Sequence, residues 1–310
     1  MKISNLIKVI LGSIMLFQAL PVKARPLFFD DGSLTDEAID LCKVLKIDDK
    51  ITDARSFNDF FQKNFLRPKM FERWYDYDLG SILPIDAFPN IVTACRNLGM
   101  LDNVLPSKTS YDCVILFGSN TVTMGKICDF VKNELGNVLK NNHETKIFFL
   151  TGDRPLDARV DSKQIVKYLT KRGIPATETE AAKLIWKKNM GKRLKCTFVS
   201  VSFNEVNKNN GELKRPNTRD TVKKLLANYS ISACDILAIS INPFIPYQDN
   251  VLRNVLIEQG FFTDGGTLET VGYTSNEKLP SMVLDQRHVI NILLDTIARC
   301  AFEEIKHINK

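Results

Sequence analysis

Small or amide-bearing polar residues follow each of four short apolar runs in the central part of the chain. They are Gly118, Ser119 and Asn120 after the first run, Gly152 and Asp153 after the second, Asn217 and Thr218 beyond a loop after the third, and Asn242 after the fourth. Glycine lets a backbone approach a ligand, and an asparagine carboxamide donates and accepts hydrogen bonds, which suits sugar hydroxyls and base edges. Taken singly, each residue is more often a helix N-cap or a turn residue. Their recurrence after every apolar run predicts a polar ligand site.

Charged groups could extend this site toward an anionic ligand. The helices expected after Asn120 and Asn217 would present N–H groups at their amino ends, which favour a negative charge. Arg154 and Arg219 lie in the same segments and could contact a carboxylate or phosphate in bidentate geometry. The chain has neither a G-x-G-x-x-G motif nor a P-loop, so neither standard nucleotide fingerprint applies.

No residue stands out as a catalyst. The histidines, His143, His288 and His307, all lie outside the loops that follow the apolar runs, which argues against a Ser-His-Asp triad and against a histidine metal site. The sequence contains no G-x-S-x-G elbow. The carboxylates that could act are Asp153 and Glu180, and Glu180 also fits a first-turn acid that the helix dipole favours.

The elements that would position these residues alternate between strands and helices. The apolar runs 114–117, 147–150, 197–201 and 236–239 lack polar alternation, as expected for strands buried on both faces. Helical patterns separate them at about 123–140, 161–172, 179–190, 217–229 and 247–259. This alternation predicts an α/β fold with a Rossmann-like parallel sheet, whose ligands bind beyond the carboxyl ends of the strands. Residues 268–273 could add an edge strand, and a long helix is expected at about 285–306.

The first third of the chain has helical periodicity instead. Apolar faces predict helices from Leu34 to Leu45 with Ser33 or Thr35 as N-cap, from about Ser56, and from about Asp86 to Gly99. An aromatic and acidic loop at 74–78 could be a ligand lid, although packing is the preferred interpretation. We therefore divide the chain into residues 1–24, an N-terminal helical extension at 25–106, and a Rossmann-like domain at 107–310.

Residues 1–24 have the pattern of a secretory signal peptide. Lys2 and Lys8 precede an apolar run from Val9 to Leu20, and Val22-Lys23-Ala24 fits a small-x-small cleavage site. The run is short for a membrane span, which needs about 20 residues. The expected location is periplasmic or secreted. The alternative is an uncleaved anchor in the inner membrane, the one case in which the membrane would be a partner.

Composition excludes some classes of protein. The chain has 310 residues, 44% hydrophobic and 25% charged, which is typical of a globular protein and not of a disordered one. Its net charge of +6 includes no dense basic run interleaved with aromatic residues, so no nucleic-acid partner is expected. The seven cysteines show no C-x-x-C spacing and are best explained as buried small hydrophobes, with one unassigned disulfide left open.

Four segments in this order resemble the YdcF, SanA and ElyC family of bacterial envelopes, a domain of unknown function. Residues 111–120 resemble its opening strand and Gly/Asn loop, 149–153 its second strand, 179–181 its Glu-Ala helix start and 216–221 its Asn-Thr segment. The helical start is most similar to the YdcF branch. Two departures are Asp153, where the family has a second glycine, and Asn242-Pro243, which no arginine-containing run follows. The resemblance implies a Rossmann-like fold, envelope association and, for the YdcF branch, S-adenosylmethionine binding.

Two functional hypotheses follow. The first is an exported YdcF-like protein that binds a small polar or nucleotide-like ligand at the strand ends. If this protein is catalytic, we expect it to be an envelope-related enzyme. The second is a non-catalytic secreted or envelope interaction protein on the same scaffold. Export counts against S-adenosylmethionine, because the protein would have to find this cofactor outside the cytoplasm. No metal is expected.

Overall fold

The computed structural model describes residues 25–68, 83, 85–136, 139, 144–191, 194–202, 216–231, 233–273 and 286–308. The expected signal peptide at 1–24 and the aromatic loop at 74–78 lie outside the described residues. None of the described helices is both long enough and apolar enough to cross a membrane.

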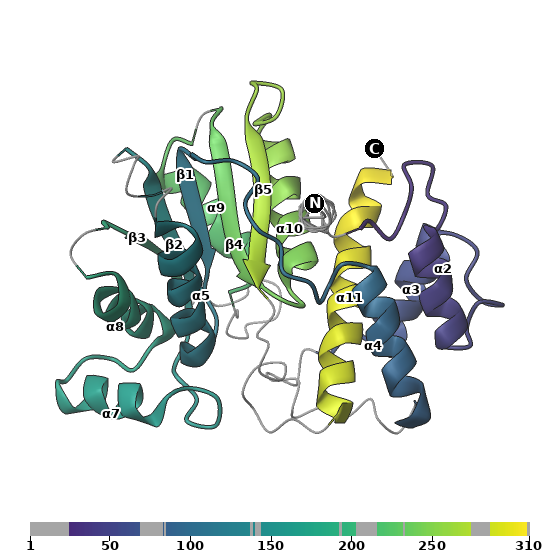
Figure 1. Ribbon diagram of the computed structural model, residues 1–310, viewed down its shortest axis with the longest axis horizontal. Coiled ribbons are helices and arrows are strands. Elements are labelled where there is room, and N and C mark those ends of the chain that lie inside the picture. The colour runs from purple at the N-terminus through teal and green to yellow at the C-terminus, as the bar shows by residue number, and fades with distance from the viewer. Residues whose placement is uncertain are drawn as a thin grey trace, which may run out of the picture.

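Five parallel strands form one sheet in the order β3-β2-β1-β4-β5 (Figure 1). They are β1 (Cys113–Phe117), β2 (Lys146–Asp153), β3 (Thr197–Ser202), β4 (Asp235–Ile241) and β5 (Thr267–Tyr273). The four predicted strands and the predicted edge strand are therefore confirmed, as is the α/β Rossmann-like fold class. All five β1 residues are buried, as expected for a central strand with helices on both faces.

Helices cover both faces of the sheet. One face packs against α5 (Thr121–Glu134), α7 (Lys163–Lys171) and α8 (Glu178–Met190), and Val114, Leu116 and Phe149 lie in this apolar layer. The other face packs against α9 (Thr218–Asn228) and α10 (Ile245–Glu258), and Ile115 and Phe148 lie there. Successive strand residues thus bury their side chains on opposite faces, because side chains alternate along a strand.

The strand order changes direction between β1 and β4. The chain leaves β1 toward α5 on one face and leaves β4 toward α10 on the other. In an open α/β sheet, the usual ligand position lies beyond the carboxyl ends of two strands whose loops diverge in this way. Residues 118–120 and 242–244 border this position.

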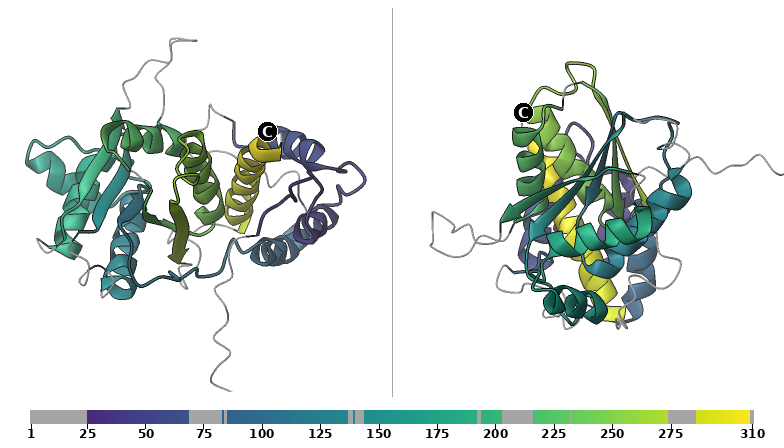
Figure 2. Two further views of the ribbon diagram at one scale, coloured as in Figure 1. Left: turned by 90° about the horizontal axis from the view of Figure 1, so that it is seen from above. Right: turned by 90° about the vertical axis from the view of Figure 1, so that its left-hand side faces the viewer.

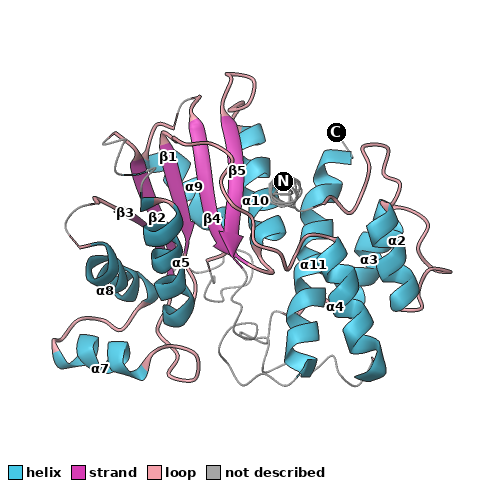
Figure 3. Cartoon of the chain, viewed as in Figure 1, coloured by secondary structure: helices cyan, strands magenta, loops and turns pink. Residues whose placement is uncertain are grey.

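A separate apolar core lies beside the sheet, in the part of Figure 3 that contains only helices. It unites α2 (Asp36–Val44), α3 (Ala54–Asn64), the short helix η2 (Ile85–Ala87), α4 (Phe88–Asn97) and the C-terminal α11 (Gln286–Ile308). Thr35, not Ser33, is the N-cap of α2. In Figure 2, α11 (yellow) lies between the sheet layers and the purple and blue helices. The N-terminal helical extension therefore completes its core with the last helix of the chain.

All seven cysteines are free, so the disulfide left open by the sequence is not formed. Cys42, Cys95 and Cys300 lie in the helical core, as their positions on apolar helix faces predicted. Cys113 and Cys128 are buried in the α/β part. The prediction of buried small apolar side chains is confirmed for these five, whereas Cys196 and Cys234 are only partly buried.

Glu304 links α11 to the start of the described chain and makes stability depend on pH. Its carboxylate accepts hydrogen bonds from the Leu27 N–H at 2.7 Å and from Asn250 Nδ2 at 3.1 Å. Burial raises the pKa of Glu304 from 4.5 to about 7. Because the folded-state pKa lies above the ordinary value, the folded protein binds this proton more tightly than the unfolded chain. The resulting stabilisation is complete below about pH 4.5 and is lost as the pH rises through 7.

We therefore expect the free energy of unfolding to fall between pH 5 and 7.5, by at most about 3 kcal/mol for each such carboxyl group. Glu304→Gln should flatten this slope, which urea denaturation at a series of pH values would measure. Glu180→Gln, at a partly exposed carboxylate paired with Lys183, is the control and should leave the slope unchanged. An equal slope in Glu304→Gln and the unaltered protein would contradict the prediction.

Candidate functional site

The loop after β1 lies directly over a buried carboxylate. A Cβ atom at Gly118 would meet Glu178 Oε1 at 2.3 Å and the Leu150 carbonyl oxygen at 2.6 Å. The Gly118 N–H donates to the same carbonyl at 2.7 Å, which holds the loop against β2. Glycine is therefore required here by close approach, as its type suggested, but the approaching group belongs to the protein itself.

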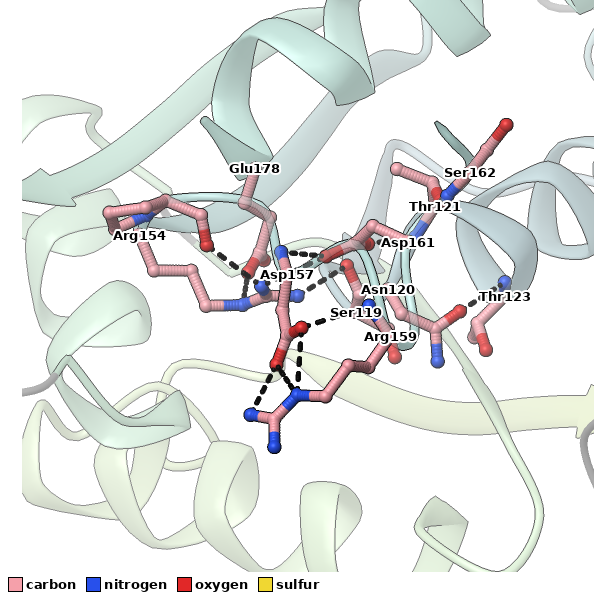
Figure 4. A network of polar contacts seen from close by, with 11 residues as sticks. Ser119, Asn120, Thr121, Thr123, Arg154, Asp157, Arg159, Asp161, Ser162 and Glu178 are labelled. Carbon is pink, nitrogen blue, oxygen red and sulfur yellow. Dashed lines mark hydrogen bonds and ion pairs between the residues drawn. The ribbon is translucent and has the colours of Figure 1, made fainter. Parts of the chain in front are cut away.

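A buried network of charges lies beneath this loop (Figure 4). Arg154 Nε lies 2.6 Å from Glu178 Oε2, and Arg154 Nη1 lies 3.3 Å from Asp161 Oδ2. The side chains of the three residues are each no more than 7% exposed. Arg154 also donates to the Ser119 carbonyl oxygen at 3.5 Å. The network thus ties the end of β2 and the start of α8 to the β1 loop.

Asp161 holds the amino end of α5. Its Oδ1 accepts from the Thr121 N–H at 2.8 Å, and its Oδ2 accepts from the Asp157 N–H at 2.9 Å. The Ser162 N–H donates to Thr121 Oγ1 at 2.6 Å. The Asn120 side chain accepts from the Thr123 N–H at 2.9 Å and is the N-cap of the helix. Two N–H groups of the first turn are therefore already bound by protein oxygens.

This geometry corrects two expectations about anion binding. Two N–H groups at the amino end of α5, those of Thr121 and Thr123, are not free for a ligand anion, because the Asp161 carboxylate and the Asn120 side chain accept from them. Arg154 is not available for a ligand carboxylate either, since it is paired with two protein carboxylates. These two N–H groups and Arg154 are therefore used within the protein. Neutral or cationic polar groups fit this part of the site better.

Arg219 is likewise paired with protein carboxylates. It contacts Glu258 on α10 and lies 3.6 Å from Glu303 on α11. Asn217 forms a capping box with Asp220: its side chain accepts from the Asp220 N–H at 3.0 Å, and the Asp220 carboxylate accepts from the Asn217 N–H at 3.1 Å. Thr218 is the first residue of α9. The start of α9 is thus held by its own cap and by the terminal helix.

The other predicted site residues lie at the same edge of the sheet in different environments. Gly152 and Asp153 end β2, and a Cβ at Gly152 would lie 3.4 Å from Pro216 Cβ, an ordinary contact. Asn242 is buried after β4, and its Nδ2 donates to the Asp102 carbonyl oxygen at 2.5 Å. Asn242 therefore tethers the segment that connects the helical part to β1.

Glu178 is the acidic residue that the sequence interpretation missed in favour of Glu180. Glu180 lies in the first turn of α8, where it pairs with Lys183 at 2.6 Å and is partly exposed. The Thr177 N-cap accepts from the Glu180 N–H, as in the first half of a capping box. That cap was the available signal: it assigns Glu180 to the third helical position and Glu178 to the first. A position two residues away on a helix lies on a different face.

Glu178 can exchange a proton near neutral pH. Burial raises its pKa from 4.5 to about 7, while Arg154 opposes this rise. With Glu178 ionised the three charged side chains sum to −1, and with Glu178 protonated they are neutral. No set of three or more His, Cys, Asp or Glu side chains in the described part of the chain is placed to hold a metal ion. The arrangement suits hydrogen bonding and proton exchange at a fixed loop.

No protein-family model matches the chain, and no curated protein or solved structure shows significant similarity to it. The likeness to YdcF, SanA and ElyC therefore rests on the four sequence segments. Residues 118–120 and 152–153 lie at the ends of adjacent strands.

Proposed function

We propose that this chain is an exported, YdcF-like α/β protein that binds a small, uncharged or cationic polar ligand at the carboxyl edge of its sheet. The ligand would lie beside Gly118, Ser119 and Asn120, beyond the strand ends where the strand order changes direction. Nucleosides and amino-bearing ligands such as S-adenosylmethionine belong to this chemical class, whereas sugar phosphates fit it less well.

The buried network of Arg154, Asp161 and Glu178 is the observation that supports this proposal. Replacing a buried ion pair with apolar side chains often leaves stability unchanged or raises it. A buried set of three charges is therefore poorly explained by stability alone. Titratable groups with shifted pKa values cluster at functional sites, and Glu178 lies directly beneath the β1 loop that borders the usual ligand position of this fold. Positioning the loop for a ligand explains both features.

A thermal-shift screen of the full-length protein tests the proposal. The panel contains adenosine, S-adenosylmethionine, a neutral disaccharide and glucose 6-phosphate. A ligand at 100 times its Kd should stabilise the protein by about 2.7 kcal/mol, which raises Tm by several degrees. We expect a rise with a neutral or cationic member of the panel. The absence of any rise across the panel would refute the proposal.

Asn120→Ser separates ligand contact from helix capping. Serine and asparagine are comparable N-caps, so the unliganded Tm should stay within about 1 °C, whereas the carboxamide available to a ligand is lost. We expect the ligand-dependent rise in Tm to fall by at least half. Asn217→Ser, which keeps the capping box of α9, tests the second asparagine in the same way. A full ligand response in both variants would place the ligand elsewhere.

A non-catalytic interaction protein is the second candidate, and one observation favours it. Three polar side chains that the sequence offered to a ligand have an internal structural partner: Asn120 and Asn217 cap helices, and Arg154 is ion-paired. This candidate would gain if Asn120→Ser and Glu178→Gln left the cellular phenotype intact while an exposed helix residue was essential. Phe302 on α11, which is 47% exposed, is the first such residue to replace.

A further inference from the structure

A cavity lies at the opposite edge of the sheet, at the amino ends of the strands. It has a volume of about 500 Å³. Residues from the starts of β2 and β3 and from the end of α9 line it, among them Lys146, Phe148, Lys195, Thr197, Tyr229 and Ser230. In Figure 1 this is the end of the strands away from the arrowheads. β2 spans eight residues from Lys146 to Asp153, so the cavity is roughly 23 Å from the first site.

Two lysines face this cavity side by side. Phe148 and Thr197 are register partners on adjacent strands. Lys146 lies two residues before Phe148 in β2, and Lys195 lies two residues before the start of β3; both line the cavity. Like charges on neighbouring strands repel each other. Within the described residues neither lysine has an acidic partner at ion-pair distance.

An aromatic surface adjoins the two lysines. The Tyr229 and Phe148 rings lie 5.0 Å apart in a tilted arrangement, and Tyr229 is 36% exposed. Phe148 belongs to the apolar layer beneath α9, which fixes the floor of the cavity. Ligand sites are concave, of about 300–1,000 Å³, and combine apolar walls with a few polar groups. The volume and the lining both fit that description.

We propose that this cavity binds a small organic oxyanion, with its phosphate or carboxylate group between Lys146 and Lys195 and its ring against Tyr229. Lysine ammonium groups form charge-assisted hydrogen bonds to both kinds of oxyanion. The site is independent of the one proposed at the carboxyl edge, because the two lie at opposite ends of β2 and share no residue.

The test is a titration of the full-length protein followed by ¹H–¹⁵N NMR, with four probes: phenyl phosphate, benzoate, inorganic phosphate and phenol. We expect saturable shifts at residues 145–148 and 228–230 with phenyl phosphate or benzoate, and weaker binding of phenol. Whichever of these two aryl anions binds more tightly shows whether the cavity prefers a phosphate or a carboxylate group. Lys146→Gln/Lys195→Gln should weaken its binding about tenfold or more. Lys163→Gln/Lys167→Gln on α7, two exposed lysines with the same charge change, should leave it unchanged.

Tyr229→Ser should weaken phenyl phosphate but leave inorganic phosphate unaffected, because only the aryl ligand contacts the ring. Without ligand, the double lysine variant should have an equal or higher Tm, since it removes a repulsion. A lower Tm would mean that the lysines serve the carbonyl end of α9, which has no basic residue in its last turn, and would overturn the proposal. Binding that is equal in both double variants, or absent for all probes at millimolar concentration, would overturn it too.

Discussion

Gly118→Ala is expected to destabilise the protein by about 3 kcal/mol, the upper end of the cost of overpacking. The added Cβ would lie 2.3 Å from Glu178 Oε1 and 2.6 Å from the Leu150 carbonyl oxygen. Neither atom can move cheaply. The carbonyl belongs to the backbone of β2 inside the sheet, and the carboxylate is held by the buried Arg154.

Two other glycines provide matched controls. A Cβ at Gly152, also at a strand end, would make only an ordinary contact at 3.4 Å, so Gly152→Ala should change the free energy of unfolding by less than about 1 kcal/mol. A Cβ at Gly125 would meet nothing within 4 Å, and alanine favours the interior of a helix by about 1 kcal/mol, so Gly125→Ala in α5 should stabilise. Urea denaturation would rank the three variants. A cost at Gly118 no larger than at Gly152 would contradict the close approach of Glu178.

Arg154→Met is expected to cost about 3–5 kcal/mol, because it leaves the Glu178 and Asp161 carboxylates buried without their cation. Arg159→Met is the control: Arg159 pairs with Asp157 at 2.8 Å, but its side chain is 62% exposed. Exposed pairs of this kind contribute about 0–1 kcal/mol. Chemical denaturation at pH 7 would measure both changes.

The cost of Arg154→Met should also depend on pH. Burial already raises the pKa of Glu178 to about 7, and Arg154 is the group that opposes this rise. Without Arg154 the folded-state pKa lies still further above that of the unfolded chain. Stability is then retained at low pH and lost as the pH rises, so the cost should be smaller at pH 5 than at pH 7.

The double variant Arg154→Met/Glu178→Met shows what the network does. If the Arg154–Glu178 pair positions the loop and does not stabilise the fold, the double variant should recover at least half of the free energy of unfolding that Arg154→Met loses. Its ligand-dependent rise in Tm should stay smaller than that of the unaltered protein. If stability does not recover although the variant folds, the ion pair is itself a net stabilising contact. Asp161 is retained in this variant because it also binds the Thr121 and Asp157 N–H groups.

The sheet could be predicted because its signal is local. Unbroken apolar runs separated by amphipathic segments specify buried parallel strands and crossover helices, and each predicted strand agrees with an observed one to within three residues at either end. The helices of the first third could be predicted for the same reason, since their apolar faces repeat with the helical period. The burial of Cys42, Cys95 and Cys300 could be predicted from the apolar helix faces on which they lie.

Side-chain partners could not be predicted in this way. Asn120 and Arg154 have the residue types of a ligand site, but whether such a group binds a ligand or the protein depends on what lies opposite it in space. For Arg154 the opposing groups are Asp161, seven residues away, and Glu178, 24 residues away. The first turn of α8 contains two acidic residues, Glu178 and Glu180, and their sequence context did not show which of them is buried.

By itself the sequence determined that a parallel sheet forms and that small polar residues gather at the carboxyl ends of its strands. The physical reason is that burial on two faces and alternation along the chain are both written in local patterns of apolar residues. Only the tertiary structure decided which of those polar residues are already occupied, that Glu178 and not Glu180 lies under Gly118, and that α11 completes the N-terminal core. Contacts of that kind depend on distances between residues far apart in the chain, and a local pattern does not contain them.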